Sequence, residues 1–257
     1  MNRRPRNAPV KRPGWVVVTL SVIVIGALVW GIRWATYARP PLPEALAALA
    51  SDERVTVSRD PWLTFTPAQV TPRTGFIFYP GGRIDPRGYA SLMKAIASEG
   101  YLVVVPKMPI NMAAFRPNVA TKIVAAFPEV RRWAIGGHSV GGAMAAQYTH
   151  THPERIDGLA IWASYPPGGA DLSGLAIPVL SIYGSRETTV TDESVGARKH
   201  LLPADTRYVR IEGGDHHQFG AYAIEPDEHR ATVDRAAQHA QILRQTLALL
   251  ETVSETD

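Results

Sequence analysis

The residues with the clearest chemical potential lie at positions 137–141, which read G-H-S-V-G. The short run 132–136 before them predicts a buried strand, and the small residues 142–148 after them predict a helix. A serine at a sharp strand-to-helix turn exposes its hydroxyl group, and flanking glycines let the helix and the strand approach closely. We interpret Ser139 as a nucleophile. The alternative is a glycine-rich turn in which Ser139 caps the following helix.

A serine nucleophile needs a general base that takes its proton. The glycine-rich loop after the predicted strand 206–211 carries His216 and His217. We predict that His216 is the base and keep His217 as the neighbouring alternative. Two other interpretations are solvated loop histidines and a metal site completed by Asp215, but no third well-spaced ligand accompanies them. We therefore expect no metal, and serine chemistry of this kind needs no cofactor.

The base in turn needs a carboxylate that holds the correct tautomer and stabilises the imidazolium ion. The loop 184–192 follows the predicted strand 178–183 and contains two candidate acids, Glu187 and Asp192. We predict that Glu187 is this acid and keep Asp192 as the alternative. Asp192 has a second interpretation, as the cap of a helix that begins near residue 193.

The reaction of a serine with a carbonyl group also needs hydrogen-bond donors for the oxyanion. The backbone amide of Val140, directly after the serine, is the first candidate. The second donor should come from the loop 80–83 after the predicted strand 74–79, because glycine there permits close approach of the backbone. We predict the amide of Gly82, with Arg83 next.

These loops need a scaffold that brings them together. Most strand candidates are continuous apolar runs, as expected for strands buried on both faces. The predicted strands are 74–79, 101–105, 133–135, 158–163, 178–183 and 206–211, with 55–57 and 62–65 as an opening antiparallel pair. The predicted helices are 87–99, 116–127, 139–150, 192–201 and 229–252, the last with an apolar stripe at Ala236, Ala240, Leu243, Leu247 and Leu250. This alternation predicts an α/β fold with a mostly parallel central sheet flanked by helices. In such sheets ligands bind beyond the carboxyl ends of the strands.

The N-terminal segment carries a different signal. Residues 14–32 are uncharged and mostly apolar, long enough as a helix to span a bilayer, and tryptophans lie near both ends. Because basic residues precede this run, we predict a basic cytoplasmic tail at 1–13 and a transmembrane signal anchor at 14–34. A proline-rich linker at 35–44 and a main domain at 45–257, outside the cytoplasm, are expected to follow. A cleaved signal peptide, which would release the main domain, is the alternative.

The charge distribution excludes one class of partner. Seven of the 27 basic residues and none of the 23 acidic residues lie within residues 1–43, so the rest of the chain has 20 basic against 23 acidic residues. The main domain therefore lacks the basic surface that nucleic-acid binding requires. The chain contains no cysteine, which excludes disulfides and thiolate chemistry.

Six motifs of the main domain, taken together and in this order, resemble the α/β-hydrolase fold superfamily. They are FIFYPGGRIDPRGY (76–89), VVVPKMPINMAAF (103–115), GGHSVGGAMAAQY (136–148), IWASYPP (161–167), IYGSRE (182–187) and EGGDHHQFGAY (212–222). They most resemble a bacterial, often membrane-anchored branch near the dienelactone-hydrolase-like enzymes. The resemblance implies a hydrolase with serine, acid and histidine in that chain order. The chain departs from the usual pattern at two positions, with Asp215 in place of Asn and Glu187 in place of Asp.

The residues and the resemblance together predict a serine hydrolase that acts on a small carboxylic ester or lactone through an acyl-enzyme intermediate. The alternatives are an acyltransferase on the same fold and a non-catalytic, membrane-anchored binding module. About fourteen residues separate Ala163 from Pro178, too few for a large helical lid. We therefore expect an open site.

Overall fold

The apolar runs of the main domain form one sheet of eight strands in the computed structural model, which describes residues 14–255. The strands are β1 (Val55–Ser58), β2 (Leu63–Pro67), β3 (Thr74–Tyr79), β4 (Leu102–Val105), β5 (Arg132–His138), β6 (Gly158–Trp162), β7 (Val179–Gly184) and β8 (Arg207–Ile211). Their order across the sheet is β1-β2-β4-β3-β5-β6-β7-β8. β2 runs antiparallel to β1 and β4, and the other neighbouring pairs are parallel. The predicted mostly parallel sheet is confirmed.

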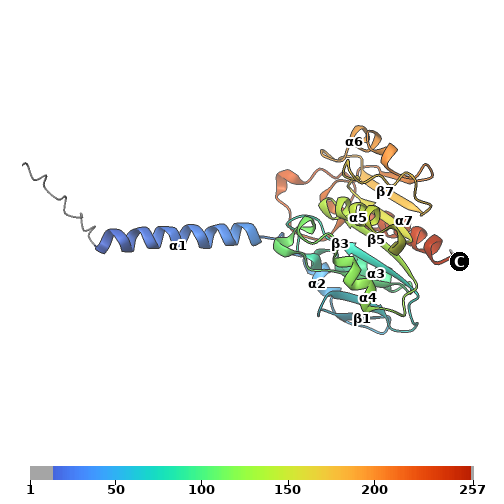
Figure 1. Ribbon diagram of the computed structural model, residues 1–257, viewed down its shortest axis with the longest axis horizontal. Helices are drawn as coiled ribbons and strands as arrows, with labels where there is room; N and C mark the ends of the chain where they lie inside the picture. Colours follow the sequence, from blue (N-terminus) through green and yellow to red (C-terminus); the bar gives the residue numbers. More distant parts are fainter. Residues whose placement is uncertain (1–13, 256–257) are drawn as a thin grey trace, which may run out of the picture. The chain divides into compact units, whose positions relative to one another are not determined.

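Helices cover both faces of this sheet (Figure 1). The α-helices of this unit are α2 (Pro43–Ala47), α3 (Ala90–Ala97), α4 (Val119–Ala126), α5 (Val140–Thr151), α6 (Asp192–Gly196) and α7 (Arg235–Glu255). Apolar side chains of α3 and α7 share one buried cluster, and those of α4 and α5 share another. The sequence therefore places two helices against each side of the sheet, as an α/β fold requires.

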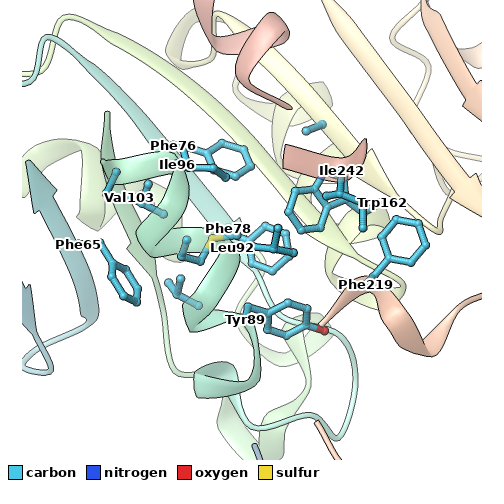
Figure 2. Packing of buried hydrophobic residues seen from close by; sticks show 14 of the residues in the cluster. Phe65, Phe76, Phe78, Tyr89, Leu92, Ile96, Val103, Trp162, Phe219 and Ile242 are labelled. Atoms are coloured by element: carbon cyan, nitrogen blue, oxygen red, sulfur yellow. The ribbon is translucent and has the colours of Figure 1, made fainter. Parts of the chain in front are cut away.

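The two clusters lie on opposite sides of the sheet because successive side chains of a strand point to opposite faces. In β3, Phe76 and Phe78 join the cluster of α3 and α7, whereas Ile77 and Tyr79 join the cluster of α4 and α5. Figure 2 shows part of the first cluster, with Trp162 of β6 among the labelled side chains. Burial on both sides explains why the strands are continuous apolar runs in the sequence.

The last helix differs from the predicted one in its start and in its buried face. α7 begins at Arg235 and not at residue 229, because the backbone amides of Arg230 and Ala231 donate to the carboxylate of Asp215 (2.9 and 3.0 Å) and are held outside the helix. Its buried face includes Gln238 as well as apolar side chains. Of the predicted stripe, Leu250 is buried, Leu243 and Leu247 are partly buried, and Ala236 and Ala240 are exposed. Gln238 faces the interior because it forms two hydrogen bonds with the backbone of Asp215 (3.1 and 2.8 Å).

The predicted proline-rich linker contains a segment that is bonded to the sheet-containing unit. The amide of Arg39 donates to the carbonyl of Arg83 (2.8 Å), and the amide of Leu42 donates to the carbonyl of Ala221 (2.9 Å). We call residues 39–42 the N-terminal strap. It connects the loop after β3 with the segment that follows the two histidines, so these residues do not act as a free spacer.

The segment before the strap forms its own unit, which ends at Tyr37. It contains α1 (Gly14–Thr36), along which large apolar side chains such as Trp15, Leu28 and Trp34 are exposed.

Crossing a bilayer requires both length and apolarity, and no helix within residues 14–255 meets this requirement. The predicted transmembrane anchor, with the membrane as a partner, is therefore not supported. The predicted cytoplasmic tail lies outside the described residues, and the location of the main domain outside the cytoplasm stays a prediction.

Candidate active site

Ser139 lies at the turn between β5 and α5 with a strained backbone. Its φ and ψ are 54° and −124°, a combination that non-glycine residues adopt only when the surrounding structure enforces it. Gly137 and Gly141 are needed because a larger side chain would clash with the neighbouring backbone, and not because their own dihedral angles require glycine. A Cβ atom on Gly141 would overlap the carbonyl oxygen of Tyr79, and one on Gly137 would overlap the backbone of Gly141. The interpretation of Ser139 as a strained residue at a sharp turn agrees with this geometry.

The register of the sheet brings the loops together. Tyr79 pairs with Gly137, so the loop after β3 starts beside the loop that carries Ser139. Gly184 pairs with Ile211, so the loops after β7 and β8 also start side by side. All four loops leave the carboxyl ends of parallel strands, which is where ligands bind in such sheets.

Glu187 and His216 are in direct contact across the loops after β7 and β8. The Nδ1 atom of His216 lies 2.8 Å from Oε2 of Glu187. The Glu187 side chain is 0% exposed and the His216 side chain is 21% exposed. Because a carboxylate can only accept, Nδ1 carries the hydrogen and Nε2 is left as a proton acceptor. The second carboxylate oxygen accepts a long hydrogen bond from the amide of Gly184 (3.4 Å).

Asp192, the alternative acid, is engaged elsewhere. Its carboxylate accepts a hydrogen bond from the Tyr183 hydroxyl (2.8 Å) and lies 3.2 Å from Nε of Arg210. It is also not the helix cap, because Thr191 caps α6 through a hydrogen bond from the amide of Ser194 (3.2 Å). Of the two acids in this loop, Glu187 is therefore the one that contacts the histidine.

The two residues whose amides are predicted as oxyanion donors, Gly82 and Val140, lie close to each other. A Cβ atom built on Gly82 would be 3.7 Å from Cγ2 of Val140 and 3.1 Å from Sδ of Met112. Within residues 14–255, neither the Gly82 amide nor the Val140 amide has a protein acceptor. Arg83, the second choice for this role, uses its amide to donate to the carbonyl of Asn111 (2.7 Å). The free amides are thus those of Gly82 and Val140.

An open cleft of about 460 Å³ is lined by Ser139, Val140 and His216, among others. The residues that line it are Ser139, Val140, Ala143, Ala163, Ser164, Tyr165, Thr188, Thr189, Val190, His216 and His217. Apart from the histidines its walls are uncharged. No helix lies between β6 and β7 in the described chain, in agreement with the expected absence of a large lid. Burial and the neighbouring His216 both lower the pKa of His217.

Asp215 has a structural role that the sequence did not indicate. Its carboxylate accepts backbone hydrogen bonds from His217, Gln218, Arg230 and Ala231 at 2.9 to 3.0 Å. These bonds shape the loop that carries His216 and engage both carboxylate oxygens. Across residues 14–255 no group of three His, Asp or Glu side chains is placed to hold a metal ion.

Comparison with known proteins identifies the family. Residues 75–240, more than half of the chain, match the alpha/beta hydrolase family, and the chain belongs to it. A predicted CIB-like hydrolase from Thermoplasma acidophilum is similar in structure, with a TM-score of 0.56 and 15% identity over 77% of this chain and 98% of that chain. A thermophilic esterase from the planctomycete Thermogutta terrifontis has a TM-score of 0.55 and 14% identity over 79% of this chain and 94% of that chain. No curated protein matches in sequence. The likeness to dienelactone-hydrolase-like enzymes stays a prediction.

Proposed function

We propose that this α/β-hydrolase is a serine hydrolase that cleaves small carboxylic esters or lactones through an acyl-enzyme intermediate. The hydrogen bond between the buried Glu187 carboxylate and Nδ1 of His216 carries the proposal. It orients a histidine toward the cleft that Ser139 also lines. A nucleophile, an acid and a base in this order along the chain match the requirements of serine catalysis.

In the proposed first step, the Ser139 hydroxyl attacks the ester carbonyl while Nε2 of His216 takes its proton. Glu187 keeps the imidazole in the required tautomer and stabilises the imidazolium ion. The amides of Gly82 and Val140 bind the oxyanion, which is favourable because they have no acceptor within residues 14–255. Collapse of the tetrahedral intermediate breaks the ester bond, and His216 returns the proton to the leaving alcohol.

The second step releases the acyl group. Water attacks the acyl-enzyme carbonyl, and Nε2 of His216 takes one proton from this water molecule. The same two amides stabilise the second oxyanion. When this intermediate collapses, the proton returns from His216 to the Ser139 oxygen, and the carboxylic acid leaves. A lactone follows the same steps, with its own alcohol group as the leaving group.

The cleft suggests an uncharged substrate of modest size. Small and hydroxyl-bearing side chains such as Ala143, Ser164 and Thr189 form its walls, and no Asp, Glu, Lys or Arg of the described chain lines it. A charged group buried against such walls would lose hydration without gaining a partner. The esterase with a similar fold supports the choice of an ester.

The test uses the full chain with p-nitrophenyl acetate as substrate and a fluorophosphonate probe. We expect the wild type to hydrolyse the ester and to be labelled at Ser139. Ser139→Ala should abolish labelling and lower kcat by roughly 10⁴-fold or more. Ser164→Ala, which removes a hydroxyl from the same cleft, is the matched control and should stay labelled. An esterase activity that survives Ser139→Ala unchanged contradicts the proposal.

A further inference from the structure

Two buried titratable side chains beside the site have no role in the reaction described above. His138 directly precedes Ser139 and is 0% exposed, and Tyr89 is 1% exposed. The Tyr89 hydroxyl lies 2.8 Å from Nδ1 of His138. Figure 2 shows the Tyr89 ring within the buried aromatic cluster, where its centroid is 4.9 Å from that of Phe78. Burial of polar groups is costly unless they are hydrogen-bonded, so this pair requires an explanation.

The pair is in contact with the loop that carries the proposed oxyanion donor. The amide of Gly81 donates to the Tyr89 hydroxyl oxygen (3.1 Å). A Cβ atom on Gly81 would lie 2.7 Å from Nδ1 of His138 and 2.9 Å from the Tyr89 oxygen. Both groups are therefore packed against the backbone of Gly81, and Gly82 follows it directly in the chain.

The direction of the hydrogen bonds follows from their chemistry. The Tyr89 oxygen accepts from the Gly81 amide (3.1 Å), and we assign its own hydrogen to the 2.8 Å bond with Nδ1 of His138, because this direction gives the hydroxyl hydrogen an acceptor. The imidazole then carries its hydrogen on Nε2. Burial, with the nearby His216 and His217, holds the pKa of His138 well below its ordinary value. A neutral His138 fits this arrangement because only the neutral ring can accept at Nδ1.

His138 also contacts the proposed base. Its ring centroid lies 4.7 Å from that of His216, with the two rings tilted, and 5.4 Å from the ring of Phe219, on which it stacks. His216 is also hydrogen-bonded to Glu187. The imidazole of His216 is thus in contact with both a carboxylate and a buried, hydrogen-bonded ring.

We propose that Tyr89 and His138 form a positioning pair that fixes the Gly81–Gly82 backbone and the His216 ring relative to Ser139. The inference rests on the proposed function, because it assigns the pair to the alignment of the oxyanion donor and the base. Neither side chain lines the cleft, so neither is a catalytic residue. Misplacement of reacting groups by about 1 Å is enough to slow such a reaction.

The first test is Tyr89→Phe in the full chain, which removes one oxygen atom and keeps the aromatic packing. Hydrolysis of p-nitrophenyl acetate should show kcat reduced by roughly tenfold and KM changed by less than about twofold. Tyr148→Phe is the matched control. Tyr148 is also buried, but its hydroxyl bonds to Thr121 (3.0 Å), on the opposite face of the sheet. This control should keep the wild-type kcat despite a comparable loss of thermal stability.

The second test is His138→Phe, which keeps a ring against Phe219 and removes Nδ1. Because the two side chains act through one shared hydrogen bond, the double variant should be no slower than the slower single variant. If the fold reductions in kcat of the two single variants multiplied in the double variant, the two side chains would act independently, and the proposed positioning pair would be overturned. So would a wild-type kcat in Tyr89→Phe, or an equal loss of kcat in Tyr148→Phe.

The outcomes separate this inference from the proposed function. A wild type that neither hydrolyses the ester nor reacts with the fluorophosphonate probe would overturn both. An active wild type together with an unimpaired Tyr89→Phe would overturn the positioning pair alone and leave Ser139, His216 and Glu187 as the proposed site.

Discussion

Arg39 and Glu228, which are 189 positions apart in the chain, form a bidentate ion pair with N–O distances of 2.6 and 2.5 Å. The pair joins the side chain of the N-terminal strap to the segment that follows the two histidines. Both side chains are partly buried, at 24% and 29% exposure. Planar guanidinium–carboxylate pairs of this kind are among the stronger protein hydrogen bonds. The strap is therefore held by its side chain as well as by its backbone.

This pair predicts a defined pH dependence of stability. The hydrogen bond from Arg39 lowers the pKa of Glu228 from 4.5 to about 2. A carboxylate with a depressed folded-state pKa stabilises the protein above its unfolded pKa, and this contribution is lost as the pH falls through the folded value. Glu228→Gln should lower the free energy of unfolding by about 1 kcal/mol at pH 7, as expected for a partly exposed pair. The difference from wild type should shrink between pH 4.5 and 2.

Urea unfolding of wild type and Glu228→Gln across that pH range measures this effect. Glu53→Gln is the matched control, because the Glu53 side chain is exposed. It should leave stability nearly unchanged at every pH. A stability difference for Glu228→Gln that stays constant from pH 7 to pH 2 would contradict the assignment.

The contact between Glu187 and His216 predicts which acid supports turnover. Glu187→Gln should lower kcat by roughly 10²–10⁴-fold, with a small change in KM, because an amide cannot stabilise the imidazolium ion. Asp192→Asn should keep kcat within a few-fold of wild type, since Asp192 bonds to Tyr183 and Arg210. Steady-state kinetics of both variants with p-nitrophenyl acetate decide the point. The reverse pattern would make Asp192 the acid.

Substitution of His216 should lower kcat far more than substitution of the adjacent His217. We expect His216→Gln to lower kcat by roughly 10³-fold or more, because Gln cannot act as a general base. His217→Gln should keep kcat within about tenfold, since the histidine that donates a hydrogen bond to Glu187 is His216. Labelling by the fluorophosphonate probe should slow in the same order. Equal loss in both variants would argue against the choice of His216.

The tight turn at Ser139 predicts a strong effect on stability. Gly141→Ala should destabilise the protein by about 2 kcal/mol or more, because the added methyl group would overlap the Tyr79 carbonyl. Gly174→Ala is the control, because a Cβ atom there meets no other atom within 4 Å. Urea unfolding of both variants measures the difference. A stable Gly141→Ala would show that the helix can move away from β3 without cost.

Much of the fold follows from local patterns. Continuous apolar runs predict the strands, and the alternation of runs and helices predicts the parallel sheet, because these patterns report burial directly. The start of α7 was predicted too early for a nonlocal reason. The amides of Arg230 and Ala231 bond to Asp215, and no pattern within residues 229–235 reveals that partner.

The candidate active site likewise contains residues that local sequence patterns indicate and contacts that only the tertiary structure shows. The sequence alone indicated Ser139, its two glycines and the Gly82 loop, because a strand, a sharp turn and a helix are encoded in adjacent residues. It favoured Glu187 as the acid but left Asp192, five positions away in the same loop, as the alternative. The tertiary structure decided which acid meets His216, because the pairing of Gly184 with Ile211 sets how the loops after β7 and β8 face each other. The same holds for Tyr89 with His138 and for Arg39 with Glu228, since contacts between distant segments depend on the register and twist of the whole sheet.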